Sequence, residues 1–232
     1  MRQNHNGKNH KSWSVTRQLG STVQFQEMDL VNIAKEMEAM AQTGLHFSED
    51  QFDSERYSRL RELAAELMAR SSNLSQEEIL EWSKAEFGYA TPKVDVRGFI
   101  LSNEKILLIR EDADGGRWTL PGGWADVNES PSEAVVREVE EESGYIVEPI
   151  LLLAVYDREK QGHLPVYPYH IYKIFFHCEI VGGSPQSTSE SSESRFFNID
   201  QLPELSESRV LSSQIRDFYT AVQRKDTKTR FD

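Results

Sequence analysis

The spacing of apolar residues predicts three helices in the first third of the chain. Apolar positions recur every three or four residues from Met28, as in an amphipathic helix, and Gly44 is expected to end this first helix. A second helix of the same period is predicted over residues 53–70. Ser75 followed by Glu78 is a capping-box signature, which predicts the start of a third helix. Three short helices leave apolar surface uncovered, so we expect them to pack against the rest of the chain or a second subunit.

After Pro92 the apolar positions alternate with polar ones or form short runs, which is typical of β-strands. Strands are predicted on both sides of a turn at residues 102–104. Further strands are predicted over residues 146–157 and 170–180, with a shorter one near Phe196. The main part of the protein is therefore expected to begin here and to contain a sheet.

Two segments near the C-terminus complete the expected α/β fold. The serine-rich residues 182–194 are expected to form a surface loop. Residues 205–224 carry an apolar stripe at helical spacing and are expected to form a closing helix. The stripe consists of Val210, Leu211, Ile215, Phe218 and Val222.

The most acidic part of the chain has clear helix signals. Ser130 is placed to cap a helix, Pro131 fits its first position, and Glu133 completes a capping box. Gly144 suits the C-terminal stop. The sequence therefore predicts a helix over residues 131–143.

Three glutamates of this helix are expected to share one face. Glu138, Glu141 and Glu142 stand at positions i, i+3 and i+4, where each like-charge pair destabilises a helix by about 0.2–0.5 kcal/mol. A divalent cation removes this repulsion, and Mg²⁺ prefers oxygen ligands while it keeps waters and substrate phosphates in its shell. The alternative for these three residues alone is a solvated acidic face.

The wider pattern is more specific than the glutamates alone. Gly123 is followed after five residues by Glu129, and Glu129 is followed after seven by Arg137 in the run REVEEESG. This pattern is the full Nudix box, so the chain resembles the Nudix hydrolases; its single departure is Tyr145, at a position that is usually aliphatic. The segments GYATPKVDVRGFI, RWTLPGGWAD and YPYHIYKIFFHCEIVGG extend the likeness to the subgroup with a helical N-terminal domain, which includes CDP-choline pyrophosphatases and ADP-ribose pyrophosphatases.

The resemblance implies an α/β fold, namely a Nudix α/β/α sandwich with a mixed sheet, preceded by a small all-helical N-terminal domain. We expect the helical domain at residues 28–91, where it would mediate a homodimer, and the Nudix domain at residues 92–232. The first 26 residues contain four Lys or Arg and no Asp or Glu, and residues 1–27 are expected to be a disordered basic extension.

The resemblance also implies roles for the residues of the box. The implied metal ligands are Glu138, Glu141, Glu142 and the backbone carbonyl of Gly123. Arg137 is expected to pair with Glu129 and to hold the loop against the helix, with Gly122 and Gly144 as further structural support. The water-activating group is expected among Glu141, Glu142 and two glutamates outside the box, Glu190 and Glu193, and Arg137 is included among the catalytic residues.

Substrate contacts are expected from residues outside the box. The candidates for phosphate contacts are Arg158, Lys160, His163, His170 and Lys173, although single residues of this kind are often only solvated. Trp118 and Trp124 flank the glycine pair, and either could stack on a base or pack in the core.

The amino-acid composition limits which partners and which cellular compartment we expect for the protein. The formal net charge of -12 opposes general attraction to nucleic acid or to an anionic membrane, without excluding RNA. No apolar run approaches the roughly 18 residues that a spanning helix needs. Cys178 is the single cysteine, which excludes an internal disulfide and suits a reducing cytoplasm.

We therefore expect a Mg²⁺-dependent pyrophosphohydrolase, with Mn²⁺ as a substitute, that acts on a nucleoside diphosphate linked to a second group. Water would attack a diphosphate phosphorus and release a nucleoside monophosphate and a phosphorylated group. The resemblance puts CDP-choline ahead of ADP-ribose as substrate. RNA-end processing or exonuclease activity, and a nucleotide-sensing regulator without catalysis, are the alternatives.

Overall fold

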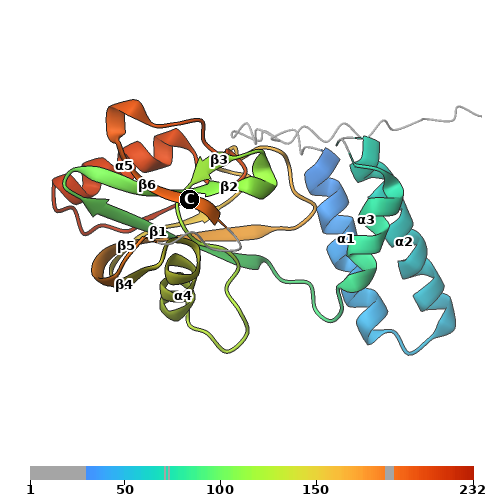
Figure 1. The fold of residues 1–232 in the computed structure, drawn as a ribbon. Coiled ribbons are helices and arrows are strands. Elements are labelled where there is room, and N and C mark those ends of the chain that lie inside the picture. The colour runs from blue at the N-terminus through green and yellow to red at the C-terminus, as the bar shows by residue number, and fades with distance from the viewer. Residues whose placement is uncertain (1–29, 71, 73, 186–190) are drawn as a thin grey trace, which may run out of the picture.

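The computed structural model describes residues 30–70, 72, 74–185 and 191–232, and the expected extension at residues 1–27 lies outside them. The described chain forms a bundle of three helices beside a larger body in which helices cover a sheet (Figure 1). The bundle consists of α1 (Leu30–Phe47), α2 (Gln51–Arg70) and α3 (Gln76–Ala85). A helical segment therefore precedes the sheet, as predicted.

The sequence predicted that the first helix ends at Gly44. In the structure helix α1 continues to Phe47. Gly44 serves the packing of α1 on α2, because a Cβ there would lie 2.3 Å from the ring of Tyr57. The predicted capping box of Ser75 and Glu78 is confirmed at the start of α3. A small core holds the bundle together and consists of Ala34, Ala65, Met68 and Ile79.

The sheet of the larger body is mixed, as predicted. Within the described residues its strands follow the order β3-β2-β1-β5-β4-β7, and β6 pairs with β2. The strands are β1 (Lys93–Ser102), β2 (Lys105–Glu111), β3 (Arg117–Thr119), β4 (Tyr145–Asp157), β5 (Ile171–Gly183), β6 (Ser191–Asn198) and β7 (Arg230–Phe231). Strands β1 and β5 run parallel, with Lys93 opposite Ile171 and Asp95 opposite Lys173.

Two helices cover the sheet, α4 (Pro131–Ser143) and α5 (Ser212–Gln223). They lie on opposite sides of it (Figure 1). Val135 and Val139 of α4 belong to one buried cluster, whereas Phe218 of α5 packs with Phe99 and Phe175 in another. Burying an apolar face of each helix against the sheet gives the predicted α/β/α sandwich.

Two boundary predictions near the C-terminus were wrong. The closing helix starts at Ser212 rather than at residue 205, and the residues before it include a bridge between Leu205 and Trp118. The serine-rich residues 182–194 were predicted to form a loop. In the structure β5 continues to Gly183 and β6 begins at Ser191, so both ends of this stretch belong to strands. Pairing of β6 with β2 overrides the low strand propensity of its serines.

Short 3₁₀ turns complete the described chain at Asp112–Asp114 and Ile199–Gln201. The predicted turn between β1 and β2 is confirmed, with positive φ values of 48° at Asn103 and 61° at Glu104. None of the described helices combines the length and the apolar character needed to cross a membrane.

Candidate active site

Helix α4 begins and ends where its capping residues predict. The Ser130 Oγ accepts a hydrogen bond from the backbone N–H of Glu133 at 3.3 Å, and the backbone N–H of Ser130 donates to the Glu133 carboxylate at 2.8 Å. Gly144 ends the helix in the left-handed region, with a φ of 76°. These caps fix the position of the glutamates on α4.

A glycine turn at Gly122 and Gly123 lies directly against this helix and against β1. A Cβ on Gly122 would fall 2.0 Å from the backbone oxygen of Val96, and a Cβ on Gly123 would fall 2.5 Å from a carboxylate oxygen of Glu138. The Gly123 carbonyl accepts a hydrogen bond of 2.8 Å from the Val96 N–H. At Gly122 only glycine permits this approach, because the neighbour is backbone and φ is 140°, whereas a side chain at Gly123 would displace the Glu138 carboxylate.

Arg137 ties the acidic groups of the box together. Its guanidinium donates to both oxygens of Glu129, at 2.8 and 3.0 Å, so the preceding loop is held to the helix. The same side chain donates to Glu138 and to Glu141, each at 2.9 Å. Hydrogen bonding to Arg137 lowers the pKa of Glu129 and raises the pKa of Arg137 itself.

The three glutamates of α4 differ in their surroundings. Glu138 and Glu142 are buried, whereas the Glu141 side chain is 50% exposed. Burial raises the pKa of Glu142 to about 8 and also raises the pKa of Glu138. The Glu142 carboxylate accepts a hydrogen bond of 2.6 Å from the Gly122 N–H. Two carboxylates whose charge is costly in this environment favour the binding of a cation beside them.

The donors fit a hard divalent cation in their chemical type. Carboxylate oxygens of Glu138, Glu141 and Glu142 and the carbonyl of Gly123 are the ligands that Mg²⁺ takes in proteins. Within the described residues, no three acidic, histidine or cysteine side chains converge in an arrangement that would hold a metal ion. Arg137 instead donates hydrogen bonds to Glu138 and Glu141, and the Gly122 N–H donates to Glu142.

A buried charged cluster lies beside the glycine turn, on β1 and β5. Arg97 donates two hydrogen bonds to Asp95, at 3.1 and 2.7 Å, and Lys173 donates to the same carboxylate at 2.5 Å. All three side chains are at most 8% exposed. Burial is the largest influence on Asp95, yet the two cations outweigh it and lower its pKa to about 2. Burial lowers the pKa of Lys173 to about 8.

This cluster forms one wall of a cavity of about 80 Å³, which we call the cationic cavity. Arg158 lines it with a fully buried guanidinium that stacks 4.6 Å from the centre of the Tyr167 ring. Gly123 also lines it, so the turn that contacts Glu138 borders the cationic cavity as well. Its charged lining residues are Asp95, Arg97, Arg158, Lys173 and Arg209. The positive charges outnumber the negative ones, which suits an anionic ligand.

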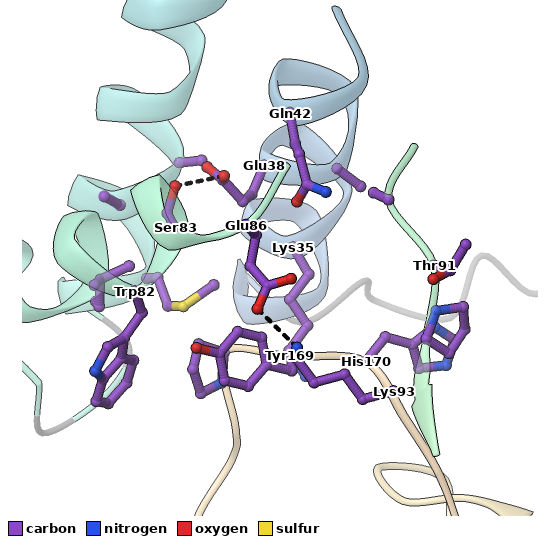
Figure 2. Close-up of a pocket in the computed structure, with 18 of the residues that line it drawn as sticks. Lys35, Glu38, Gln42, Trp82, Ser83, Glu86, Thr91, Lys93, Tyr169 and His170 are labelled. Carbon is purple, nitrogen blue, oxygen red and sulfur yellow. Dashed lines mark hydrogen bonds and ion pairs between the residues drawn. The ribbon is translucent and has the colours of Figure 1, made fainter. Parts of the chain in front are cut away.

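The structure brings only some of the predicted substrate contacts together. Arg158 and Lys173 both line the cationic cavity. Lys160 is exposed in a turn. His170 pairs with Asp157 at 3.1 Å and faces a different cavity, between the bundle and the sheet (Figure 2).

His163 lies in a buried hydrogen-bonded position. Its Nδ1 is 2.8 Å from the carbonyl of Glu207, and its Nε2 is 3.1 Å from the side-chain amide of Gln214. The neutral ring satisfies both contacts, with Nδ1–H as donor and Nε2 as acceptor. Burial, with the charge of Lys173 as the next cause, lowers the pKa of His163 to about 4.

The two tryptophans and the glutamates outside the box, which the sequence analysis named as candidates, lie in different parts of the structure. The Trp118 ring packs edge to face on Phe197, with centroids 4.7 Å apart. Trp124 is 45% exposed and lines the cationic cavity. Glu193 lies in β6 and its carboxylate pairs with Arg195, while Glu190 lies outside the described residues.

Several residues of the site escaped the sequence-based prediction. Asp95, Arg97 and Arg209 carry no motif of their own, and they meet only because β1, β5 and the segment before α5 converge. Glu111 was also missed; it pairs with Arg209 at 3.2 Å, and its charge contributes to the raised pKa of Glu142. The only sequence signal for these residues was the run DVR, which places two opposite charges, Asp95 and Arg97, on the same face of a strand.

A sandwich in which a glycine turn meets a carboxylate-bearing helix is the arrangement expected of a hydrolase acting on phosphorus-containing anhydrides. Residues 91–218 match the family described as "NUDIX domain", so the chain belongs to the Nudix hydrolase family. Residues 28–82 match a second description, "UDP-X-like, N-terminal oligomerisation domain".

Similar proteins align with more than half of this chain. "Putative ADP-ribose pyrophosphatase YjhB" of Bacillus subtilis (strain 168) is 45% identical over 199 residues, which cover 86% of this chain and 95% of that protein. The solved structure titled "UDP-X diphosphatase" is 38% identical with a TM-score of 0.57, over 88% of this chain and 98% of the other. An ADP-ribose pyrophosphatase from Streptococcus suis is also 38% identical, with a TM-score of 0.56 over 61% of this chain and all of the other.

Proposed function

We propose that the protein is a Mg²⁺-dependent pyrophosphohydrolase that cleaves the diphosphate of a nucleoside diphosphate sugar of the ADP-ribose type. The products would be a nucleoside monophosphate and a phosphorylated sugar. The single observation that carries the proposal is the glycine turn, which borders carboxylates suited to a metal on one side and the cationic cavity on the other. A diphosphate placed at this turn would meet both kinds of charge.

Glu138, Glu141, Glu142 and the carbonyl of Gly123 would hold the metal, with Mn²⁺ as a substitute for Mg²⁺. When bound, the metal neutralises phosphate charge and lowers the pKa of a water ligand. Arg137 orients Glu138 and Glu141 and fastens the loop through Glu129. Glu141, Glu142 and, from β6, Glu193 are the proposed groups that accept the proton of the attacking water.

The charge of the cationic cavity favours a sugar phosphate over choline. Three arginines and one lysine line it, against Asp95 alone. Phosphate oxygens and sugar hydroxyls can accept hydrogen bonds from these side chains, whereas the quaternary ammonium of choline would be repelled. The names of the similar proteins, with ADP-ribose pyrophosphatases among them, support the same choice. CDP-choline, the substrate favoured by the sequence, stays a prediction to be measured beside it.

A substrate panel tests the proposal. Purified protein is mixed with ADP-ribose, a UDP-sugar, CDP-choline, NADH or capped RNA, each with Mg²⁺ or with excess chelator, and the products are identified. We expect metal-dependent release of AMP and ribose 5-phosphate, with kcat/KM for ADP-ribose at least tenfold above that for CDP-choline. Preference for RNA would support the exonuclease alternative, and tight binding of nucleotides without turnover would support a regulator.

We also propose a homodimer formed through the helical segment. Large apolar side chains are exposed there, including Phe47, Phe52 and Phe87, which are 65, 67 and 84% exposed. The match of residues 28–82 to an oligomerisation domain supports this assembly. Light scattering at micromolar concentration should give twice the mass of the chain, and a monomer at that concentration would exclude the dimer.

A further inference from the structure

A second cavity, of about 240 Å³, lies between the helical bundle and the sheet (Figure 2). We call it the interdomain cavity; the residues used below are Gln42, Trp82, Glu86, Lys93 and Tyr169. Two ion pairs connect the helical segment to the Nudix domain here: Lys93, which lines the cavity, contacts Glu86 at 2.7 Å, and Lys35 of α1 contacts Glu159 after β4 at 2.9 Å. The helical segment therefore supplies one wall of a cavity whose other wall belongs to the Nudix domain.

The backbone leads from the glycine turn to this cavity. Residues after Gly123 run antiparallel to β1, since the Val96 N–H donates to Gly123 and the Ala125 N–H donates to Val94. Lys93 is the next residue of β1 beyond Val94 and lines the interdomain cavity. At roughly 3.3 Å per residue, the step from Val96 to Lys93 spans about 10 Å. This is comparable to the reach from a diphosphate across a ribose to its base.

An open groove shares lining residues with both cavities along this path. It is lined by Lys93, Val94, Trp124, Ala125 and Tyr169. Lys93 and Tyr169 also line the interdomain cavity, and Trp124 also lines the cationic cavity. An extended ligand could therefore occupy the cationic cavity, the glycine turn and the interdomain cavity at once.

The two cavities differ in chemistry. In the interdomain cavity, the rings of Trp82 and Tyr169 are neighbours, with centroids 6.4 Å apart and planes inclined by 35°. Gln42 and Glu86 add hydrogen-bonding groups, and the carboxylates of Glu38 and Glu86 balance the ammonium groups of Lys35 and Lys93. Aromatic surface with a few polar groups, located at a domain interface, is typical of a site for an uncharged planar ligand.

We propose that the interdomain cavity binds the nucleobase of the substrate, while the cationic cavity, with a volume of about 80 Å³, binds the phosphate group that leaves with the sugar. The helical segment thereby forms a substrate subsite in addition to its role in assembly. This inference rests on the proposed function for the identity of the ligand. Stacking of a base on an aromatic side chain stabilises the bound nucleotide, so loss of the Trp82 ring should weaken nucleotide binding about tenfold.

The test compares Trp82→Ala with Trp82→Phe and with Phe231→Ala. Phe231 is an exposed aromatic residue of β7 and does not line either cavity. For ADP-ribose, Trp82→Ala should raise KM about tenfold with little change in kcat, Trp82→Phe should restore most of the affinity, and Phe231→Ala should match the wild type. For two riboses joined 5′ to 5′ through a diphosphate, which lacks the base, Trp82→Ala should leave KM unchanged.

Equal effects of Trp82→Ala on both substrates, or on neither, would overturn the inference. Calorimetric titration with AMP keeps the test separate from hydrolysis: Trp82→Ala should weaken AMP binding about tenfold even if the wild type cleaves a different diphosphate. Unchanged AMP affinity would reject the subsite and leave the proposed function standing. If Trp82→Ala does not fold, Tyr169→Leu changes the opposite ring and should give the same pattern.

Discussion

Two arginines lie near Glu138 and Glu142, and their networks are built differently. Arg137 is partly exposed and binds Glu129, Glu138 and Glu141, all within eight positions of it in the sequence. Arg97 is buried, and its partner Asp95 also binds Lys173, which comes from a neighbouring strand far along the chain. The first network holds the carboxylates in place, and the second places positive charge beside them. A site for a diphosphate needs both.

The largest effect should come from a carboxylate of the first region. Glu142→Gln keeps the shape and can still accept the Gly122 N–H, but it removes a charged oxygen from the proposed metal site. We expect kcat to fall about a hundredfold or more, while the melting temperature stays the same or rises because a carboxyl group whose ionisation is opposed by burial is replaced by a neutral amide. Steady-state kinetics and thermal unfolding measure the two effects.

Glu140→Gln is the matched control for this change. Glu140 lies on the same helix and is exposed, so the variant removes the same charge away from the site. It should keep wild-type turnover. Similar turnover in both variants would mean that the carboxylates of α4 are only solvated charges.

A change in the network of Arg97, Asp95 and Lys173 should lower the free energy of unfolding as well as turnover. Asp95→Asn removes the anion that pairs with Arg97 and Lys173 and leaves two buried cations without it. Breaking a buried pair in this way typically costs about 3–5 kcal/mol. Urea unfolding should show a loss of that size, whereas Asp126→Asn, which removes a carboxylate that is 75% exposed, should change the free energy of unfolding by less than about 1 kcal/mol. Equal losses would remove the distinction between the two networks.

The contrast also explains what the sequence could predict. The residues of the first network lie within one loop and one helix, so their spacing in the box and the caps at Ser130 and Gly144 indicated their proximity. Asp95 and Lys173 meet through the parallel pairing of β1 and β5, which no local pattern specifies. Lys173 was a candidate by residue type, but its buried partner was not foreseeable.

Gly44 illustrates the same limit in the helical bundle. The residue type suggested a helix stop, whereas contact with Tyr57 from another helix decided its role. The interdomain cavity likewise depends on how the bundle meets the sheet, so its residues have no shared signature in the sequence.

A smaller effect is expected in the pH dependence of stability. It should come from His163, which is buried and contacts Gln214 of α5, rather than from the exposed histidines. Its pKa of about 4 lies below the unfolded value of 6.5, so its contribution to stability is present above pH 6.5 and is lost as the pH falls toward 4. Between pH 7 and pH 5 the loss should be roughly 2 kcal/mol.

Urea unfolding at several pH values measures this loss. His163→Gln can retain hydrogen bonds to Glu207 and Gln214 but does not titrate, so its unfolding free energy should fall less on acidification than that of the wild type. Parallel pH profiles for the two proteins would show that His163 is not held in its neutral form.

In the proposed reaction, water attacks a diphosphate phosphorus at the glycine turn rather than a carbon atom. Hydrolysis of ADP-ribose with Mg²⁺ in ¹⁸O-labelled water, followed by mass spectrometry of the products, tests this most directly. One ¹⁸O atom should enter the phosphate group of either AMP or ribose 5-phosphate, and hydrolysis should stop with chelator. Label on a ribose carbon together with intact ADP would contradict the account.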